Sequence, residues 1–122
     1  MKLKVGQFAR LKSGYICKII NINDFRDPNM KYGVEANYLK DVMFIGDDDV
    51  VKASYNIIDI LEVGDYVNGN KVDFTNNNNK LSYEDKCIGF YDGDGDITLF
   101  ENGIKSVITH EQMEQMAYRV GE

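Results

Sequence analysis

The residue types that could do nucleophilic or metal chemistry are scarce in this sequence. It has two cysteines, Cys17 and Cys87, and one histidine, His110. A catalytic thiol or serine needs a histidine as its base, and zinc sites place Cys and His ligands at close spacings that these three residues lack. Both cysteines lie in strand-like apolar segments, where they are expected to be reduced core thiols, and His110 is expected to be an exposed polar residue. We therefore predict no catalytic residue, no metal ligand and no cofactor.

Carboxylates are abundant, and they occur in clusters that could bind a partner. The chain has 20 Asp and Glu against 14 Lys and Arg, a formal net charge of −6. Clustered carboxylates can pair with the Lys and Arg that line a nucleic-acid channel, much as phosphates do. Direct nucleic-acid binding is not expected, because it ordinarily uses a basic face. The partner-binding candidates are Asp47, Asp48, Asp49, Glu84, Asp85, Asp92, Asp94 and Asp96.

The last three of these carboxylates are separated by single residues, and an EF-hand calcium loop likewise begins with carboxylates at its first, third and fifth positions. The sixth position of such a loop needs Gly and the twelfth needs a bidentate Glu. Counted from Asp92, those positions hold Ile97 and Gly103. The segment 92–96 is therefore predicted to be an acidic hairpin tip rather than a calcium site.

A pocket for a signalling nucleotide is the alternative hypothesis. Such a pocket needs several phosphate donors, and the arginines available are Arg10, Arg26 and Arg119. The sequence has no Gly-rich phosphate-binding motif. Binding at the interface of a homo-oligomer would supply each donor twice, so this hypothesis stays open.

The elements that must position these residues are mostly strands and turns. The β-branched run 15–22 and the preceding segment 4–12 flank Ser13-Gly14 and predict a hairpin. Thr109 and Gln112 have the spacing of a capping box and predict a short helix over 110–116. The four asparagines at 76–79 predict a solvated loop. The other predicted strands cover 32–38, 41–45, 55–61, 71–74, 85–91, 97–100, 104–108 and 117–120.

A short pattern of residue types occurs twice in the sequence. Residues 63–67 match residues 5–9 in kind at each position: Val, Gly, a polar residue, an aromatic and a small apolar residue. Asn68-Gly69 follows directly, a dipeptide typical of a type I′ hairpin turn. We predict one compact β domain over 1–122, with a pseudo-repeat of 4–61 and 62–122.

These openings resemble the first strands of SH3-like barrels, including the KOW type. The segments 62–72 and 106–122 are also similar to small phage and prophage proteins of low-GC Gram-positive bacteria. The resemblance implies a phage origin and transfers no functional residue. The fold prediction is accordingly a mainly β protein, an SH3-like or small β-barrel built from two related hairpin units with one short C-terminal helix.

Function is expected to follow from binding. The resemblance and the acidic charge together suggest a non-enzymatic phage protein that inhibits a host antiviral defence system, in the manner of an anti-CRISPR protein that blocks the nucleic-acid site of an effector. The alternatives are a sponge for a signalling nucleotide and a phage structural or DNA-associated β-barrel module. No apolar run could span a bilayer and no signal peptide is evident, so the expected location is the cytoplasm of the infected host cell.

Overall fold

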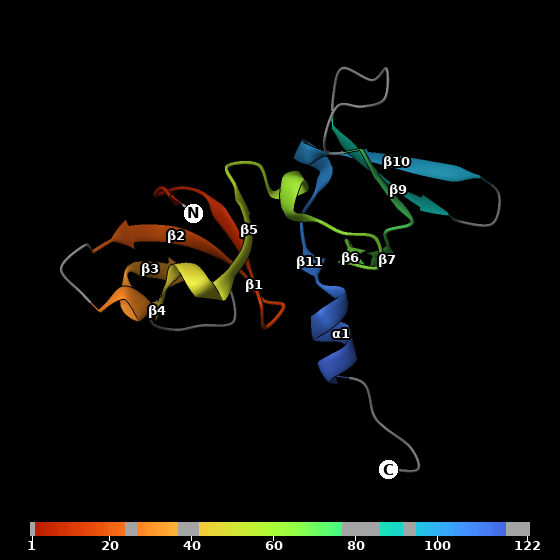
Figure 1. The fold of residues 1–122 in the computed structure, drawn as a ribbon. Helices are drawn as coiled ribbons and strands as arrows, with labels where there is room; N and C mark the ends of the chain where they lie inside the picture. The colour runs from red at the N-terminus through yellow and green to blue at the C-terminus, as the bar shows by residue number, and fades with distance from the viewer. Residues whose placement is uncertain (1, 24–26, 37–41, 77–85, 92–94, 117–122) are drawn as a thin grey trace, which may run out of the picture. The chain divides into compact units, whose positions relative to one another are not determined.

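The chain is mainly β and divides into two compact units, Met1–Ile60 and Leu61–Glu122. A computed structural model describes residues 2–23, 27–36, 42–76, 86–91 and 95–116, which include eleven strands in three antiparallel sheets and one α-helix (Figure 1). The boundary between the units lies one residue from the predicted boundary of the pseudo-repeat. The mainly β class and the short C-terminal helix are confirmed, and no closed barrel forms among the described residues.

The first unit is a single five-stranded sheet with the order β4-β3-β2-β1-β5. Strands β1 and β2 form the predicted hairpin, in which Arg10 pairs with Ile16. Strand β5 then returns to the far side of β1, where Ala53 pairs with Ala9. The strands are β1 (Phe8–Leu11), β2 (Ile16–Ile22), β3 (Tyr32–Glu35), β4 (Met43–Ile45) and β5 (Val50–Ser54).

The core of this unit lies on one face of that sheet. Its buried members include alternate residues of β1 and β2, as expected for strands with one face in the core. Cys17 is among them and Cys87 is buried in the second unit, and both thiols are free, as predicted. The buried cluster is Leu3, Ala9, Leu11, Cys17, Ile19, Tyr32, Val34, Ile45 and Val50.

The free energy of unfolding is expected to fall as the pH rises above about 9, because of Cys17 and Tyr32. Burial raises the pKa of the Cys17 thiol from 9.0 to about 12. Burial, and then the hydrogen bond to Asp47, also raise the pKa of the Tyr32 hydroxyl. Both groups lose their protons at lower pH in the unfolded chain than in the folded chain, so alkali favours unfolding. Urea unfolding at a series of alkaline pH values measures this slope. The slope should be shallower in the Cys17→Ala variant, and an unchanged slope would contradict the assignment to Cys17.

The segment 55–61, predicted as a strand, instead contains the 3-10 helix η3 (Ile57–Ile60). Side-chain hydrogen bonds close this turn: the Ser54 hydroxyl accepts from the N–H of Asn56 at 3.1 Å and donates to the Asp59 carboxylate at 2.5 Å. The prediction was wrong because Ile58 and Ile60, which are both buried, have the two-residue spacing that also suits a strand. Two further 3-10 helices are η1 (Pro28–Met30) and η2 (Asp47–Asp49).

The second unit contains two three-stranded sheets, with the orders β10-β9-β8 and β11-β6-β7. The predicted hairpin around 92–96 is present as β9 and β10, in which Asp96 pairs with Tyr91. Asn76, predicted to be in a loop, instead ends β8 and pairs with Cys87. The predicted loop residues 77–79 and closing strand 117–120 lie outside the described residues. The elements are β6 (Tyr66–Val67), β7 (Asn70–Lys71), β8 (Phe74–Asn76), β9 (Cys87–Tyr91), β10 (Asp96–Phe100), η4 (Glu101–Gly103), β11 (Val107–Ile108) and α1 (His110–Met116).

The predicted Asn68-Gly69 turn joins β6 to β7. Both residues have positive φ, 53° and 84°, as a type I′ turn requires. The Asn68 side chain has a second role, because its Oδ1 accepts from the N–H groups of Lys105 at 2.8 Å and Ser106 at 3.1 Å, while its Nδ2 donates to the carbonyl of Gly103 at 2.9 Å. One asparagine thus closes the hairpin and fixes the segment that leads into β11.

The turn before β1 is built around Gly6. Its φ of 95° lies in the region that glycine adopts at little cost. The N–H of Gly6 donates to the carbonyl of Ile19 at 2.8 Å, and the N–H of Ile19 donates to the carbonyl of Gln7 at 2.9 Å. The Gln7 side chain accepts from the N–H of Lys4 at 2.9 Å.

The turn before β6 has the same hydrogen-bond pattern around Gly64, whose φ is 97°. The N–H of Gly64 donates to the carbonyl of Val72 at 2.9 Å, and the N–H of Val72 donates to the carbonyl of Asp65 at 2.8 Å. The Asp65 side chain accepts from the N–H of Glu62 at 2.7 Å. The short sequence match therefore corresponds to a shared local structure, while equivalence over the whole of 4–61 and 62–122 stays a prediction.

Candidate functional site

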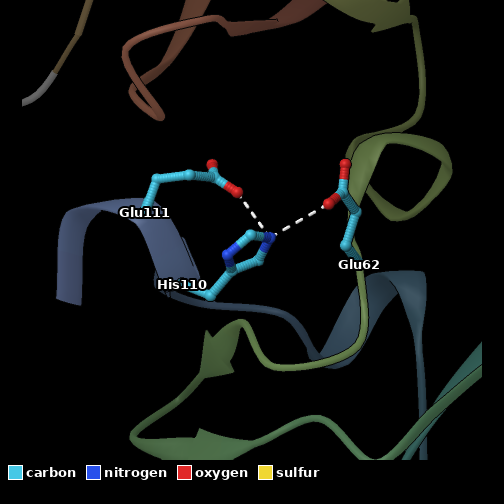
Figure 2. Close-up of side chains that lie close together, drawn as sticks. All are labelled: Glu62, His110 and Glu111. Atoms are coloured by element: carbon cyan, nitrogen blue, oxygen red, sulfur yellow. Dashed lines mark hydrogen bonds and ion pairs between the residues drawn. The ribbon is translucent and has the colours of Figure 1, made fainter. Parts of the chain in front are cut away.

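Three side chains that could bind a cation converge at the start of α1. His110 is the first residue of this helix, Glu111 follows it, and Glu62 lies just before the Gly64 turn. The Nε2 atom of His110 lies 3.0 Å from Oε1 of Glu62 and also contacts Oε1 of Glu111 (Figure 2). One potential ligand atom from each residue lies within 4.8 Å of the others. We call these three residues the His–Glu cluster.

A buried carboxylate positions two members of the His–Glu cluster. Asp65 is 0% exposed, and its Oδ2 accepts from the N–H of Glu62 at 2.7 Å while its Oδ1 accepts from the N–H of His110 at 3.0 Å. Hydrogen bonds to a charged acceptor are about twice as strong as neutral ones. Asp65 therefore ties the backbone before the Gly64 turn to the first residue of α1, 45 positions away in the sequence.

The predicted capping box fixes the first turn of α1. The N–H of Thr109 donates to Oε1 of Gln112 at 3.0 Å, and the N–H of Gln112 donates to Oγ1 of Thr109 at 3.2 Å. Reciprocal bonds of this kind satisfy donors that the start of a helix leaves without intrahelical partners. Because Thr109 is fully buried, the cap also anchors the helix start that carries His110 and Glu111.

The three side chains of the His–Glu cluster are partly open to solvent. Their exposed fractions are 42% for His110, 30% for Glu62 and 28% for Glu111. Two carboxylates converge on one ring nitrogen, and a single N–H can point at only one of them. The arrangement can act as an ion pair around a protonated imidazole, or it can hold a cation that all three ligand atoms share.

The first predicted acidic cluster, Asp47–Asp49, forms the 3-10 helix η2 between β4 and β5. Oδ1 of Asp47 accepts from the Tyr32 hydroxyl at 2.7 Å, and Oδ2 of Asp49 accepts from the N–H of Gly46 at 2.9 Å. Asp48 and Asp49 are exposed and Asp47 is half-buried. Two of the three carboxylates are thus tied to the fold, on a turn that faces solvent.

Of the other predicted site residues, the structure describes the side chain of Arg10 and the backbone of Asp96. Arg10 is 1% exposed and its Nη1 donates to the carbonyl of Ile60 at 3.1 Å, a buried position that does not favour it as a phosphate donor. Asp96 belongs to β10, and its side chain is not described. The remaining candidates, Glu84, Asp85, Asp92, Asp94, Arg26 and Arg119, lie outside the described residues.

The His–Glu cluster was not predicted from the sequence. His110 was expected to be an exposed polar residue without a cysteine or serine partner, whereas its neighbours in the structure are glutamates. Glu62 is 48 positions from His110, and the pairing of β11 with β6 and the hydrogen bonds to Asp65 bring them together. The adjacent pair His110-Glu111 at a predicted helix start was the local signal available, and it does not identify the third residue.

Comparisons with known proteins add no relative: no family model, no curated protein and no solved structure matches the chain. Within the residues that the structure describes, no helix has the length and apolar character that crossing a membrane requires.

Proposed function

We propose that the chain is a non-enzymatic, phage-encoded binding protein that inhibits a host antiviral defence system by occupying the nucleic-acid site of an effector. The observation that carries the proposal is the solvent-facing acidic turn Asp47–Asp49, which the fold holds in place at Tyr32 and Gly46. Pre-ordered carboxylates lose less conformational freedom on binding than flexible ones, so such a turn suits recognition of a basic channel.

The proposal includes an SH3-like architecture for the first unit. In its support, β1 to β4 follow one another as neighbours in the sheet, and β5 returns to pair with β1. A single 3-10 turn, η2, connects β4 to β5. This connection holds the acidic turn, so the candidate binding residues lie at a junction between two strands of the same sheet.

The second unit supports the same architecture, because its elements follow the same order. Strand β11 returns to pair with β6, and η4 lies between β10 and β11 as η2 lies between β4 and β5. The residues between β7 and β8 connect its two sheets. The N–H of Val72 donates to the backbone carbonyl of Asp65 at 2.8 Å, and the N–H of Asp73 donates to the backbone carbonyl of Gly89 at 2.8 Å. Two consecutive SH3-like units are therefore proposed, with equivalent glycine turns at Gly6 and Gly64.

The nucleotide-sponge alternative has weaker support. Phosphate binding needs exposed or pocket-facing cationic donors. The one described arginine of the three candidates, Arg10, is buried and bonded to the carbonyl of Ile60. The acidic turn offers acceptors rather than donors, so it suits a basic partner and not a phosphate group.

Replacing Asp47, Asp48 and Asp49 together by Asn is expected to weaken partner binding at least about tenfold, with little change in stability. Asn keeps an oxygen that can accept from Tyr32 and from Gly46, while the turn loses three negative charges. The measurement is affinity capture from a lysate of low-GC Gram-positive bacteria, with the wild-type and the variant chain as bait. Bound proteins and bound small molecules are identified separately.

A matched control removes three carboxylates elsewhere: Glu35→Gln, Glu101→Gln and Glu114→Gln together remove the same amount of negative charge and leave the acidic turn and the His–Glu cluster intact. Added salt should weaken the wild-type complex, because the Debye length is only about 8 Å at about 0.15 M ionic strength. Equal capture by the wild type and the Asn variant, with no effect of salt, would show that the acidic turn does not recognise the partner. Recovery of a nucleotide instead would favour the sponge.

A further inference from the structure

We infer that Glu62, His110 and Glu111 form a binding site for one divalent transition-metal ion, of which Zn²⁺ is the clearest example. The site belongs to the second unit alone and is independent of the acidic turn. The inference therefore stands or falls separately from the proposed function.

The spacing of the ligand atoms suits a small ion. Zinc binds imidazole nitrogen and carboxylate oxygen at about 2.0–2.2 Å, which places the ligands of a tetrahedral ion about 3.3–3.6 Å apart. Nε2 of His110 and Oε1 of Glu62 are 3.0 Å apart, and all three ligand atoms lie within 4.8 Å of one another. Side-chain rotations that move the ligand atoms by about 1 Å would bring them to the spacing of bound ligands.

The ligand chemistry and the charge also suit a divalent ion. Imidazole and carboxylate together are ligands that zinc and its neighbours in the first transition row accept. Two glutamates carry the charge that balances a divalent ion. An ion between the three atoms would interact with both carboxylates at once, which a single Nε2–H of His110 cannot do.

The fold orders this site before any ion arrives. Asp65 holds the backbone of Glu62 and of His110, and the Thr109 cap fixes the helix turn that carries Glu111. Side chains on a backbone that is already ordered lose less conformational freedom when they bind an ion. The three ligands are 28–42% exposed, so a water molecule can reach the ion and complete a four-coordinate shell.

The equivalent turn of the first unit shows which residues make the difference. Lys4 there takes the place of Glu62, and Gln7 takes the place of Asp65. A Cβ atom added at Gly6 would lie 3.6 Å from the Tyr55 ring, whereas one added at Gly64 would lie 3.6 Å from Cβ of His110. The same backbone turn thus carries a lysine and a tyrosine in one unit and metal-ligating side chains in the other.

Isothermal titration calorimetry of the full chain with ZnCl2 tests the inference. The wild type should bind one Zn²⁺ per chain and unfold several degrees higher in the presence of excess Zn²⁺. His110→Gln, Glu62→Gln and Glu111→Gln should each weaken this binding about 100-fold or more, and Asp65→Asn about 10- to 100-fold. Glu114→Gln, which removes a carboxylate from the same helix outside the cluster, should bind Zn²⁺ like the wild type. With CoCl2, the wild type should show visible absorption from a four-coordinate ion, and His110→Gln should not.

Two outcomes would overturn the site. If the wild type binds no Zn²⁺ at millimolar concentration, the His–Glu cluster is an ion pair only. If the wild type and all three ligand variants bind Zn²⁺ with the same affinity, the ion is held elsewhere in the chain. Because Glu62 and Glu111 have partly exposed side chains, their Gln variants should fold and keep the test valid even if His110→Gln does not.

Discussion

The Asp65→Ala variant should lose about 3–6 kcal/mol of the free energy of unfolding of the second unit. Asp65 is fully buried and accepts from two backbone N–H groups, at Glu62 and at His110. Each hydrogen bond to a charged group contributes about 1.5–3 kcal/mol, and the truncation leaves both donors without this acceptor. Urea unfolding measures the loss, and amide hydrogen exchange at Glu62 and His110 should become faster.

The equivalent residue of the first unit supplies a matched control. Gln7 accepts from the N–H of Lys4 in an exposed bond, so Gln7→Ala should cost less than about 1 kcal/mol because water replaces the lost acceptor. Asp65→Asn keeps one acceptor oxygen, so its loss of free energy of unfolding should lie between those of Asp65→Ala and Gln7→Ala. Equal losses for Asp65→Ala and Gln7→Ala would contradict the role given to Asp65.

Arg10→Ala is expected to destabilise the first unit by about 3–5 kcal/mol. The Arg10 side chain is 1% exposed and donates from Nη1 to the carbonyl of Ile60 at 3.1 Å. Truncation leaves a cavity in the fold and removes a charged donor from a carbonyl that ends η3. Chemical denaturation of the full chain measures the change in the unfolding of this unit.

Arg10→Met separates the packing of this side chain from its charge. Met keeps most of the side-chain volume and has no hydrogen-bond donor. If packing dominates, Arg10→Met should therefore lose clearly less free energy of unfolding than Arg10→Ala. A loss below about 1 kcal/mol for Arg10→Ala would show that the guanidinium does not hold η3 to the sheet.

The parts of the fold that the sequence predicted are set by local chemistry. The Asn68-Gly69 turn needs positive φ at two positions, and few other dipeptides supply it. The capping box at Thr109 and Gln112 likewise uses residues three apart, so its helix could be placed to the residue. The hairpins β1–β2 and β9–β10 join neighbours in the sequence.

The features that the sequence did not predict depend on distant partners or on ambiguous periodicity. Nothing in the sequence of 50–54 identifies β1 as the partner of β5, because this strand could pair with any apolar strand at the edge of a sheet. Buried residues at Ile58 and Ile60 fit a strand and a 3-10 turn equally. The Ser54 hydroxyl decides between them, because it donates to the Asp59 carboxylate and accepts from the N–H of Asn56.

The candidate sites divide in the same way. The run Asp47–Asp49 is visible in the sequence as an acidic turn, and the structure describes it as one. The burial of Arg10 was not predictable, because it depends on η3, which the pattern did not indicate. Glu62 joins His110 only through the pairing of β11 with β6 and through the buried carboxylate of Asp65.

The most direct test of the proposed function is displacement of nucleic acid from the captured partner. The partner is loaded with a fluorescent oligonucleotide, and the anisotropy of the label is followed as the wild-type chain is added. We expect the anisotropy to fall to the value of the free oligonucleotide, and the variant with Asn at 47, 48 and 49 to need an at least about tenfold higher concentration for the same fall. If the oligonucleotide stays bound at a saturating concentration of the wild-type chain, the protein does not occupy the nucleic-acid site and the proposal is wrong.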